Sequence, residues 1–529
     1  MTGVGTAVKI VTIADALREQ ADIRADKTAF IFEGDTLTYA ELNDGASRVA
    51  NGLLSLGLQP DERVAYLGKN SHFYFELLMG AAKAGGVTCP VNWRLAGPEI
   101  VYILNDSKAR TLVLGSEFIA TYNAIKDELA FIETVLCTEG ASQGVLDYRA
   151  WRDGFATADP EIARSGNDDA LQLYTSGTTG HPKGAVISND AMLVRHDSRG
   201  MTPPDWSKWT ADDMSLVAMP CFHIGGTGWG LTGIFNGATG VVMREFDPTR
   251  VLDFIDEYRI SKMFMVPAAM KIVVEQPKAQ QVDFSPLKYM LYGASPIPLD
   301  LLKSCMDVFQ CGFVQMYGMT ETSGTIVALP PEDHDPNGNE RMRSVGKPLE
   351  GVEVKIIDAE GNTLPPRDVG EIATRSIGNM SAYWNLDAAT KTTIDDEGWL
   401  RTGDAGYTDE DGYIYIHDRV KDMIISGGEN VYPAEVENAV FSHPAVADVG
   451  VIGIPDDKWG EAVKACIVLK DGAQVSEDDI ITYTRTQIAA FKCPKSVDFI
   501  EALPRNPSGK ILRRELRAPY WDGKDRAVN

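Results

Sequence analysis

Cysteine is scarce in this chain and is never clustered. The 529 residues include seven cysteines, widely separated, and no Cys-x-x-Cys pair occurs. Disulfide frameworks and common zinc sites both need cysteines at close, recurring spacings. The pattern therefore excludes a disulfide scaffold and a zinc module. A reducing compartment fits it best, which predicts a cytoplasmic protein.

Long apolar runs and targeting segments are also missing. No stretch of about 18 or more apolar residues occurs, so we expect no membrane span. The N-terminal MTGVGTAVKIVTIADALREQ lacks a basic region followed by a long apolar core, and we expect no signal peptide. The C-terminal DRAVN carries no peroxisomal or retention signal.

Positive charge is in deficit. Lys and Arg number 50 against 75 Asp and Glu, a formal net charge of −25. Nucleic acids and anionic membranes attract positive charge, so neither is an expected partner of the whole protein. The composition, with 44% hydrophobic and 24% charged residues, is typical of a soluble globular protein. The chain is also long enough to bury a large core without metal or disulfide staples.

Two kinds of pattern follow one another along the chain. Helical periodicity alternates with short apolar runs through the first 300 residues, which is typical of an α/β fold with largely parallel sheets. A boundary is expected near residues 417–422, followed by an α+β unit of about 110 residues. We predict helices at 13–21, 39–57, 74–84, 298–309, 434–441 and 477–490, and strands at 63–67, 111–114, 352–357, 413–416, 446–454 and 462–469.

The most informative segment is residues 174–184, YTSGTTGHPKG. Seven of its eleven residues are Gly, Ser or Thr, whose backbone N–H groups and hydroxyls can surround phosphate oxygens. Lys183 adds a positive charge for a polyphosphate. The segment does not match the Walker A pattern, and a flexible surface loop has a similar composition. The residues alone therefore indicate a phosphate loop but no reaction.

This loop resembles the signature loop of the adenylate-forming superfamily, which contains acyl-CoA synthetases, peptide-synthetase adenylation domains and firefly-type luciferases. Further motifs follow in the family's order: YGASP at 292–296, YGMTE at 317–321, GWLRTGD at 398–404, DRVKD at 418–422, SGGENVYP at 426–433 and NPSGK at 506–510. The resemblance runs from about Leu37 to Arg517. It implies a large N-terminal α/β domain with parallel-rich sheets, residues 1–420, and a small mobile C-terminal α+β domain, residues 421–529. The active site is expected in the cleft between them.

The resemblance also implies a nucleotide site. Tyr317 offers a flat face to the purine, and Thr320 offers a hydroxyl to phosphate. Glu321 offers an oxygen ligand to Mg²⁺, and Asp404 accepts hydrogen bonds from the ribose hydroxyls. The implied ATP- or AMP-binding residues are Thr175, Ser176, Gly177, Thr178, Thr179, Lys183, Gly293, Ala294, Ser295, Tyr317, Gly318, Met319, Asp404 and Arg419.

Catalysis by this family requires no covalent nucleophile from the enzyme. A substrate carboxylate attacks the α-phosphate of ATP, and a cation must offset the charge that spreads over the phosphoryl oxygens. The resemblance assigns that role to Lys510, with Thr320, Glu321 and His223 as further catalytic residues. It places the hinge of the small domain at Lys421.

The second half-reaction needs a thiol. Gly427 and Gly428 would let a pantetheine arm pass close to the backbone. Trp459 and Phe491 occupy the positions of an aromatic pair that stacks on the CoA adenine in related ligases. Cys493 stands where chlorobenzoate-type ligases place an Arg for the CoA 3′-phosphate. Lys492 or Lys495 is a possible substitute, and this contact stays open.

The segment PCFHIGGTGWG at 220–230 matches the entrance of the family's acyl pocket. We expect His223, Gly225, Gly226, Trp229 and Met316 to line that pocket. Peptide-synthetase domains place an Asp near this segment to pair with an α-amine. None occurs in it, which favours a simple carboxylic acid.

The predicted function is an ATP-dependent acid–CoA ligase that acts on medium- or long-chain fatty acids with ATP, Mg²⁺ and CoA. An aryl, phenylpropanoid or alicyclic acid is the second candidate for the substrate. The motifs also fit an enzyme that loads a carrier protein, a luciferase-like oxygenase and a non-catalytic nucleotide-binding protein. The last is disfavoured because Lys183, Glu321, Asp404, Arg419 and Lys510 are all present. No nucleic-acid partner is expected, and a homodimer is possible.

Overall fold

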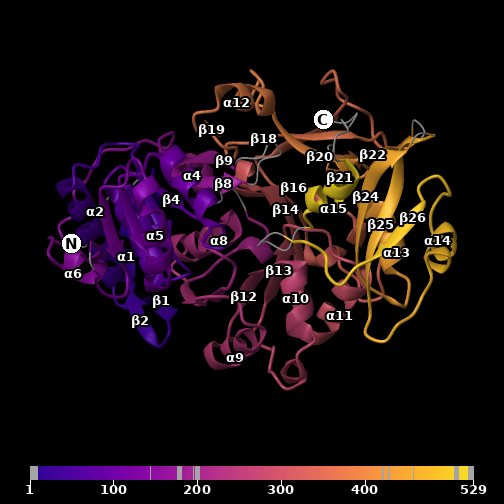
Figure 1. Ribbon diagram of the computed structural model, residues 1–529. Helices are drawn as coiled ribbons and strands as arrows, with labels where there is room; N and C mark the ends of the chain where they lie inside the picture. The colour runs from indigo at the N-terminus through magenta and orange to yellow at the C-terminus, as the bar shows by residue number, and fades with distance from the viewer. Residues whose placement is uncertain are drawn as a thin grey trace.

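The structure is a computed structural model that describes residues 10–142, 144–175, 182–194, 196, 203–419, 422–426, 429–456, 458–505 and 511–521. Figure 1 shows two parts, a large one that runs from indigo to orange and a smaller one near the yellow end of the chain. We call them the N-terminal and C-terminal regions. No helix in the described ranges is long and apolar enough to cross a membrane.

The first sheet of the N-terminal region is parallel in its centre and antiparallel at its edges. In the described chain its strand order is β16 (Lys347–Pro348), β15 (Gly324–Leu329), β14 (Gly312–Met319), β13 (Tyr289–Gly293), β12 (Lys262–Met265), β10 (Met214–Val217), β11 (Thr239–Val242), β1 (Thr28–Phe32) and β2 (Asp35–Thr38). The parallel strands end on one side of the sheet, which brings their following loops together.

The second sheet is parallel from β8 to β7 and closes with an antiparallel pair on the other side. Its order is β19 (Ala382–Tyr383), β9 (Lys183–Ser188), β8 (Asp169–Thr175), β4 (Val87–Pro90), β3 (Arg63–Leu67), β5 (Thr111–Leu114), β6 (Thr134–Cys137) and β7 (Leu146–Asp147). Every residue of β3 is buried, as expected for a strand covered by helices on both faces.

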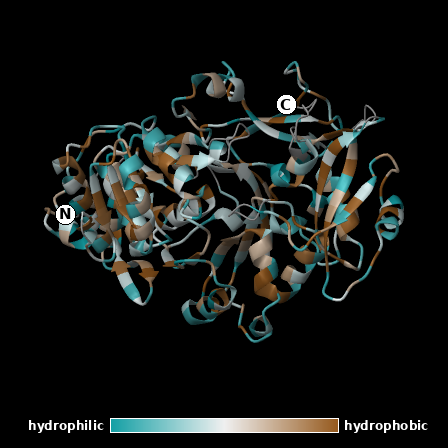
Figure 2. Cartoon of the chain, in the orientation of Figure 1, coloured by the Kyte–Doolittle hydropathy of each residue, from teal (hydrophilic) through white to brown (hydrophobic). Residues whose placement is uncertain are grey.

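Helices cover both sheets, and the brown hydrophobic segments in Figure 2 lie mainly in their interior. The helices of the N-terminal region are α1 (Ile13–Ile23), α2 (Tyr39–Ser55), α3 (His72–Lys83), α4 (Gly97–Ser107), α5 (Ile119–Ile125), α6 (Tyr148–Asp153), α7 (Asn189–Met192), α8 (Ile224–Phe235), α9 (Pro248–Tyr258), α10 (Pro267–Val274), α11 (Leu299–Phe309) and α12 (Asp387–Thr393). The start of α2 follows from its sequence, because the Thr38 hydroxyl accepts from the Glu41 N–H and the Glu41 carboxylate from the Thr38 N–H.

An antiparallel sheet completes the N-terminal region: β17 (Glu353–Ile357), β18 (Gly370–Arg375), β20 (Leu400–Thr408) and β21 (Ile414–Arg419). The C-terminal region has its own sheet of β23 (Glu429–Val431), β22 (Ile424–Ser426), β25 (Gly460–Leu469), β24 (Val446–Asp456) and β26 (Ser496–Phe499). Its helices are α13 (Pro433–Phe441), α14 (Glu477–Arg485) and α15 (Arg513–Trp521). The predicted fold class, a large α/β part followed by a small α+β part, is confirmed.

The predicted strands at 63–67 and 111–114 match β3 and β5 residue for residue. The predicted helix 477–490 is too long, because α14 ends at Arg485. The Thr486 N–H donates to the Tyr483 carbonyl, which tightens the last turn, and Ile488 then packs against the core of the C-terminal region. The inward position of Ile488 produced the apolar spacing that lengthened the prediction.

Candidate active site

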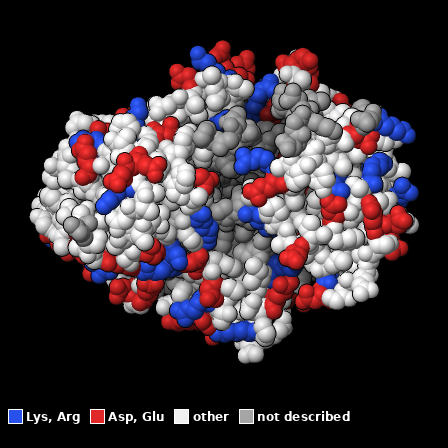
Figure 3. All heavy atoms as spheres, in the orientation of Figure 1, with Lys and Arg blue, Asp and Glu red and all other residues white. Residues whose placement is uncertain are grey.

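A cavity of about 2920 Å³ lies where the two regions meet. Its walls come from β8, β9, β14, β20 and α8 of the N-terminal region and from α13 and α15 of the C-terminal region. Figure 3 shows the molecule hollowed between its two halves, with Lys and Arg side chains at the rim. The cleft predicted between the two parts of the chain is therefore present.

The phosphate loop begins and ends on one hairpin. Thr175 is the last residue of β8, Lys183 is the first of β9, and the two are paired across the strands. Both line the cavity. Ser176, Gly177, Thr178 and Thr179 lie outside the described residues.

A set of hydrogen bonds behind this hairpin fixes its position. The Tyr174 hydroxyl donates to Asp106 Oδ2 at 2.6 Å, and Gln172 Nε2 donates to the same hydroxyl at 3.0 Å. Arg63 Nε donates to Gln172 Oε1 at 2.8 Å, and the Arg63 guanidinium lies 3.6 Å from the ring centroid of Trp384. Burial raises the pKa of Tyr174, with the charge at Cys89 as the next cause and the Asp106 carboxylate a further one. None of these supports was predicted from the sequence.

Glu321 is held inside the cavity wall. Its side chain is 5% exposed, and Oε1 accepts from the Tyr383 hydroxyl at 2.8 Å and from Thr175 Oγ1 at 3.2 Å. It lies with Thr320 in a short 3₁₀ turn, Thr320–Thr322, and both residues line the cavity. Among the described residues no group of three or more His, Cys, Asp or Glu could hold a metal. A single carboxylate fits Mg²⁺, which commonly takes one or two carboxylates and completes its shell with phosphate oxygens and water.

Asp404 and Tyr317 also line the cavity and contact each other. The Tyr317 hydroxyl donates to Asp404 Oδ2 at 2.7 Å, and Asp404 is 7% exposed. Asp404 pairs with Arg419 across β20 and β21, although Arg419 is described only through its backbone. The arrangement brings a flat ring and an acceptor carboxylate together on the cavity wall.

The backbone comes close to itself beside these groups. A Cβ on Gly318 would lie 1.9 Å from the Gly324 carbonyl oxygen, so no larger residue fits there. A Cβ on Gly293 would lie 2.1 Å from the Met316 carbonyl oxygen. Ala294 has a φ of 67° and lines the cavity together with Ser295, Met316, Gly318 and Met319.

One wall of the cavity, where the acyl pocket is predicted, is formed by α8. His223 is the N-cap of this helix, and Ile224, Gly228 and Thr232, spaced by four residues, line the cavity on one helix face. Gly225 and Trp229 line it as well, and Trp229 meets Trp209 edge-on at a ring-centroid distance of 4.9 Å.

The structure does not place Gly226 in the predicted acyl pocket. A Cβ there would lie 2.3 Å from the Pro220 carbonyl oxygen, and Gly226 is not among the described residues that line the cavity. Its small size serves the packing of α8 against the preceding turn.

The C-terminal region presents one edge to the cavity. Arg505 and Ile511, which flank the segment that contains Lys510, both line it, whereas Lys510 itself lies outside the described residues. Lys421, Gly427 and Gly428 lie outside them too.

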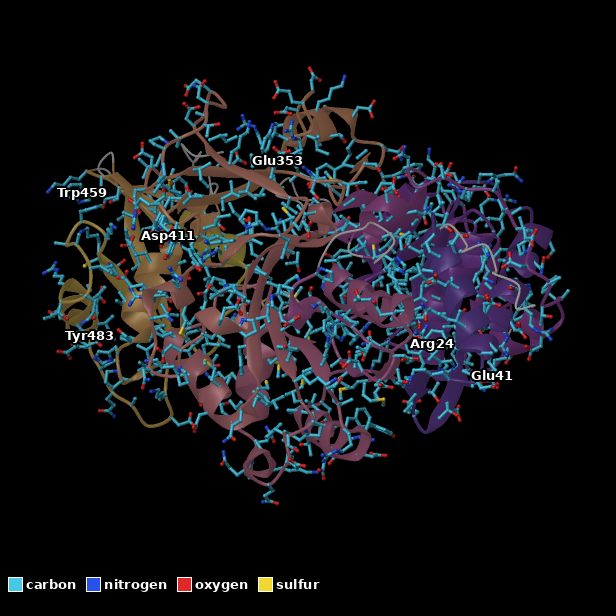
Figure 4. The ribbon with its side chains drawn as sticks, turned by 180° about the vertical axis from the view of Figure 1, so that it is seen from behind. Arg24, Glu41, Glu353, Asp411, Trp459 and Tyr483 are labelled. Carbon is cyan, nitrogen blue, oxygen red and sulfur yellow. The ribbon has the colours of Figure 1, made fainter. Side chains whose placement is uncertain are left out.

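The two aromatic residues predicted to bind CoA lie on the surface. Trp459 is 40% exposed and Phe491 is 42% exposed, and neither is among the cavity-lining residues. Figure 4 places Trp459 at the outer edge of the C-terminal region. Lys495 Nζ lies 6.0 Å from the Trp459 ring centroid, whereas Cys493 is fully buried and cannot meet a phosphate.

Comparison with known proteins agrees with this geometry. Residues 17–384 match the family model "AMP-binding enzyme", and residues 435–510 match "AMP-binding enzyme C-terminal domain". The fold and the site define an adenylate-forming enzyme, and the chain belongs to the AMP-binding enzyme family. The predicted enzyme class, an AMP-forming acid–thiol ligase, is confirmed.

Three individual similarities are informative. The chain is 44% identical over 502 residues to a fatty acid–[acyl-carrier-protein] ligase, ScoC, from Streptomyces coeruleorubidus, covering 95% of both chains. It is 38% identical over 512 residues to the long-chain-fatty-acid–CoA ligase FadD13 from Mycobacterium tuberculosis, covering 95% of this chain and 97% of that one. The crystal structure of ATP-bound MatB from Rhodopseudomonas palustris superposes with a TM-score of 0.85 at 30% identity, covering 96% of this chain and 99% of that one. Binding of ATP is supported by such ATP-bound neighbours.

Proposed function

We propose that this protein is an ATP-dependent ligase that joins a medium- or long-chain fatty acid to CoA through an acyl-adenylate. The observation that carries the proposal is the convergence of Thr175, Lys183, Glu321 and Asp404 on one cavity that continues along α8. A polar end for a nucleotide and a long wall for an acyl chain are what this reaction needs.

The nucleotide end of the cavity has a group for each part of ATP. Asp404 would accept hydrogen bonds from the ribose hydroxyls, with Tyr317 beside the purine and Ala294 and Ser295 along its other edge. Lys183 and Thr175 would meet the phosphates, and Glu321 would hold Mg²⁺. The ion, when bound, neutralises phosphate charge.

Adenylation then follows from position and charge. A carboxylate oxygen of the acid bonds to the α-phosphorus, the bond to the β-phosphate oxygen breaks, and pyrophosphate leaves. His223 and Lys510 would face the reacting oxygens, and Lys510 would offset the charge on the α-phosphate. In the second step a thiolate bonds to the acyl carbon and AMP leaves with the electron pair of the broken bond.

The α8 wall supports a chain-like acid. The helix from Ile224 to Phe235 is about 18 Å long, which suits an extended aliphatic chain of medium to long length. Trp209, Trp229 and Phe264 are apolar walls along that length. An aryl or alicyclic acid is the second candidate for the substrate. The similarity to feruloyl-CoA synthases, which are 37% identical, supports it.

The acceptor has two candidates. CoA fits the exposed Trp459, which would stack on its adenine with Lys495 nearby. A carrier protein is favoured by the similarity to ScoC, which is named as an acyl-carrier-protein ligase. Both acceptors present the same pantetheine thiol.

We also propose the division of the chain at residues 420 and 421, with Lys421 as the hinge. β21 ends at Arg419 in one sheet, and β22 begins at Ile424 in another. In one state Lys510 would face the cavity, and in the other Gly427 and Gly428 would line the path of the thiol.

The test is release of pyrophosphate and of AMP from ATP and Mg²⁺ over a panel of carboxylic acids, with CoA, with a phosphopantetheinylated carrier protein, or with neither. CoA-dependent AMP release for fatty acids supports the proposal. If AMP release depends on the carrier protein and not on CoA, the carrier protein is the acceptor in place of CoA. Absence of acid-dependent pyrophosphate release with every acid would contradict the proposal.

A further inference from the structure

Tyr383 contacts two of the groups that we propose to act on MgATP, Glu321 and Lys183. Its hydroxyl donates to Glu321 Oε1 at 2.8 Å, and Lys183 Nζ lies 5.0 Å from its ring centroid. The side chain is 7% exposed and lines the cavity. None of the sequence motifs includes it.

The backbone around Tyr383 is fastened to both partners. The Ser381 N–H donates to the Val186 carbonyl and the Trp384 N–H to the Gly184 carbonyl, which joins β19 to β9 just after Lys183. The Met380 N–H donates to the Glu321 carbonyl at 2.8 Å. Figure 1 shows β19 close to β9. One short strand therefore fixes Tyr383 relative to the phosphate loop and to Glu321.

The hydrogen bonds to Glu321 are one-sided. Both hydroxyl donors, from Tyr383 and Thr175, reach the same oxygen, Oε1. Such bonds orient a carboxylate and leave Oε2 for another ligand. Groups that donate a hydrogen bond to a metal-binding carboxylate, and so orient it, are commonly needed for full metal affinity.

We propose that Tyr383 is a positioning residue that couples the metal-binding carboxylate to the phosphate-loop lysine. Its hydroxyl turns Oε2 of Glu321 toward the Mg²⁺ of MgATP, and its ring holds the Lys183 ammonium beside the same phosphates. This inference rests on the proposed function only in that the ligand is MgATP.

Two substitutions separate the two contacts. Tyr383→Phe keeps the ring under Lys183 and removes the hydroxyl, so it should weaken binding of MgATP about tenfold, because a hydrogen bond to a charged group is lost. Its affinity for ATP in EDTA should be unchanged. Tyr383→Leu removes the ring as well and should also weaken binding of metal-free ATP several-fold.

Tyr413 provides a matched control. Its hydroxyl donates to Asp333 Oδ2 at 2.7 Å, and Arg341 and Lys347 lie 4.6 and 4.5 Å from its ring centroid. Tyr413 is 5% exposed and is not among the described residues that line the cavity. Tyr413→Phe loses a similar hydrogen bond elsewhere and should change neither affinity.

The measurement is isothermal titration calorimetry of each full-length variant with MgATP and with ATP in EDTA, together with the unfolding midpoint. The inference is supported if Tyr383→Phe no longer binds MgATP more tightly than ATP in EDTA, while its unfolding midpoint equals that of Tyr413→Phe. An unchanged metal preference in Tyr383→Phe would overturn it. Failure of the wild-type protein to bind MgATP would instead count against the proposed function.

Discussion

The proposed nucleotide side of the cavity and the exposed aromatic residues of the C-terminal region are built in opposite ways. Glu321 and Asp404 are each less than a tenth exposed, and their oxygens accept from tyrosine hydroxyls at 2.8 and 2.7 Å. Trp459 and Phe491 are each about two-fifths exposed, and each has a lysine near its ring.

The difference agrees with the roles that we propose for the two sides. Charged groups that act on phosphate must be held in place before the reaction, since a preorganised site costs no rearrangement at the transition state. An acceptor site must stay open until its partner arrives. We therefore expect substitutions on the nucleotide side to affect adenylation, and those at the exposed aromatic residues to affect only the acceptor step.

The largest expected effect is at Lys510. Lys510→Ala should lower acyl-AMP formation by at least about a hundredfold, because the charge that stabilises the transition state is lost. Thioester formation from supplied acyl-AMP should be spared. Pyrophosphate exchange and thioester assays measure the two steps, and Lys470→Ala, at an exposed residue between β25 and α14, is the control.

The hinge offers the reciprocal test. Lys421→Pro should retain adenylation and lose thioester formation, because the small domain could not reach its second state. Equal loss of both steps in Lys510→Ala, or normal thioester synthesis in Lys421→Pro, would remove the proposed division of labour between two states.

A third prediction concerns the stability of the N-terminal region. Burial, with Arg149 as a lesser cause, lowers the pKa of His72 in the N-terminal region to about 4. The unfolded chain binds this proton near pH 6.5, so the folded state loses stability as the pH falls from about 6.5 toward 4. Between about pH 7 and 5 the loss should be about 2 kcal/mol.

His72→Phe tests this, because the His72 ring packs against Phe32 and Phe73, where another ring can fit. Urea unfolding should be measured at about pH 7 and at about pH 5. On going to the lower pH, the free energy of unfolding of the variant should rise by about 2 kcal/mol relative to that of the wild type. An equal difference between the two proteins at both pH values would mean that His72 does not carry the acid sensitivity.

The smallest expected effect is at the exposed aromatic residues. Trp459→Ala should raise the KM for CoA about tenfold, because base stacking is lost, and leave pyrophosphate exchange unchanged. Phe499→Ala, at a residue that is 43% exposed in the same region, is the matched control. A similar KM for CoA in the wild type, Trp459→Ala and Phe499→Ala would favour a carrier protein as the acceptor, because its recognition does not use adenine.

The sequence predicted many of the elements because their local patterns are strong. RVAYL and TLVL are short, continuous apolar runs, and both form buried parallel strands. Thr38 and Glu41 fix the start of α2 through bonds three residues apart. By contrast, the inward position of Ile488 made α14 seem longer than it is, because apolar spacing does not distinguish a helix from a packed turn.

The same limit applies to the site. Lys183, Glu321 and Asp404 carry motifs, and they line one cavity. Gly226 belongs to the same motif as Gly225, yet it faces the Pro220 backbone. The supports Asp106, Trp384 and Tyr383 had no signal, because each contacts residues that are far away along the chain.

By itself, the sequence determined the enzyme family, the α/β then α+β order and the chemical groups of the proposed nucleotide site, because these depend on residue types at short, fixed spacings. Only the tertiary structure decided which oxygen of Glu321 is already occupied, which glycine faces the cavity and which aromatic residues stay at the surface. Those features depend on contacts between segments brought together by packing, and no local pattern encodes them.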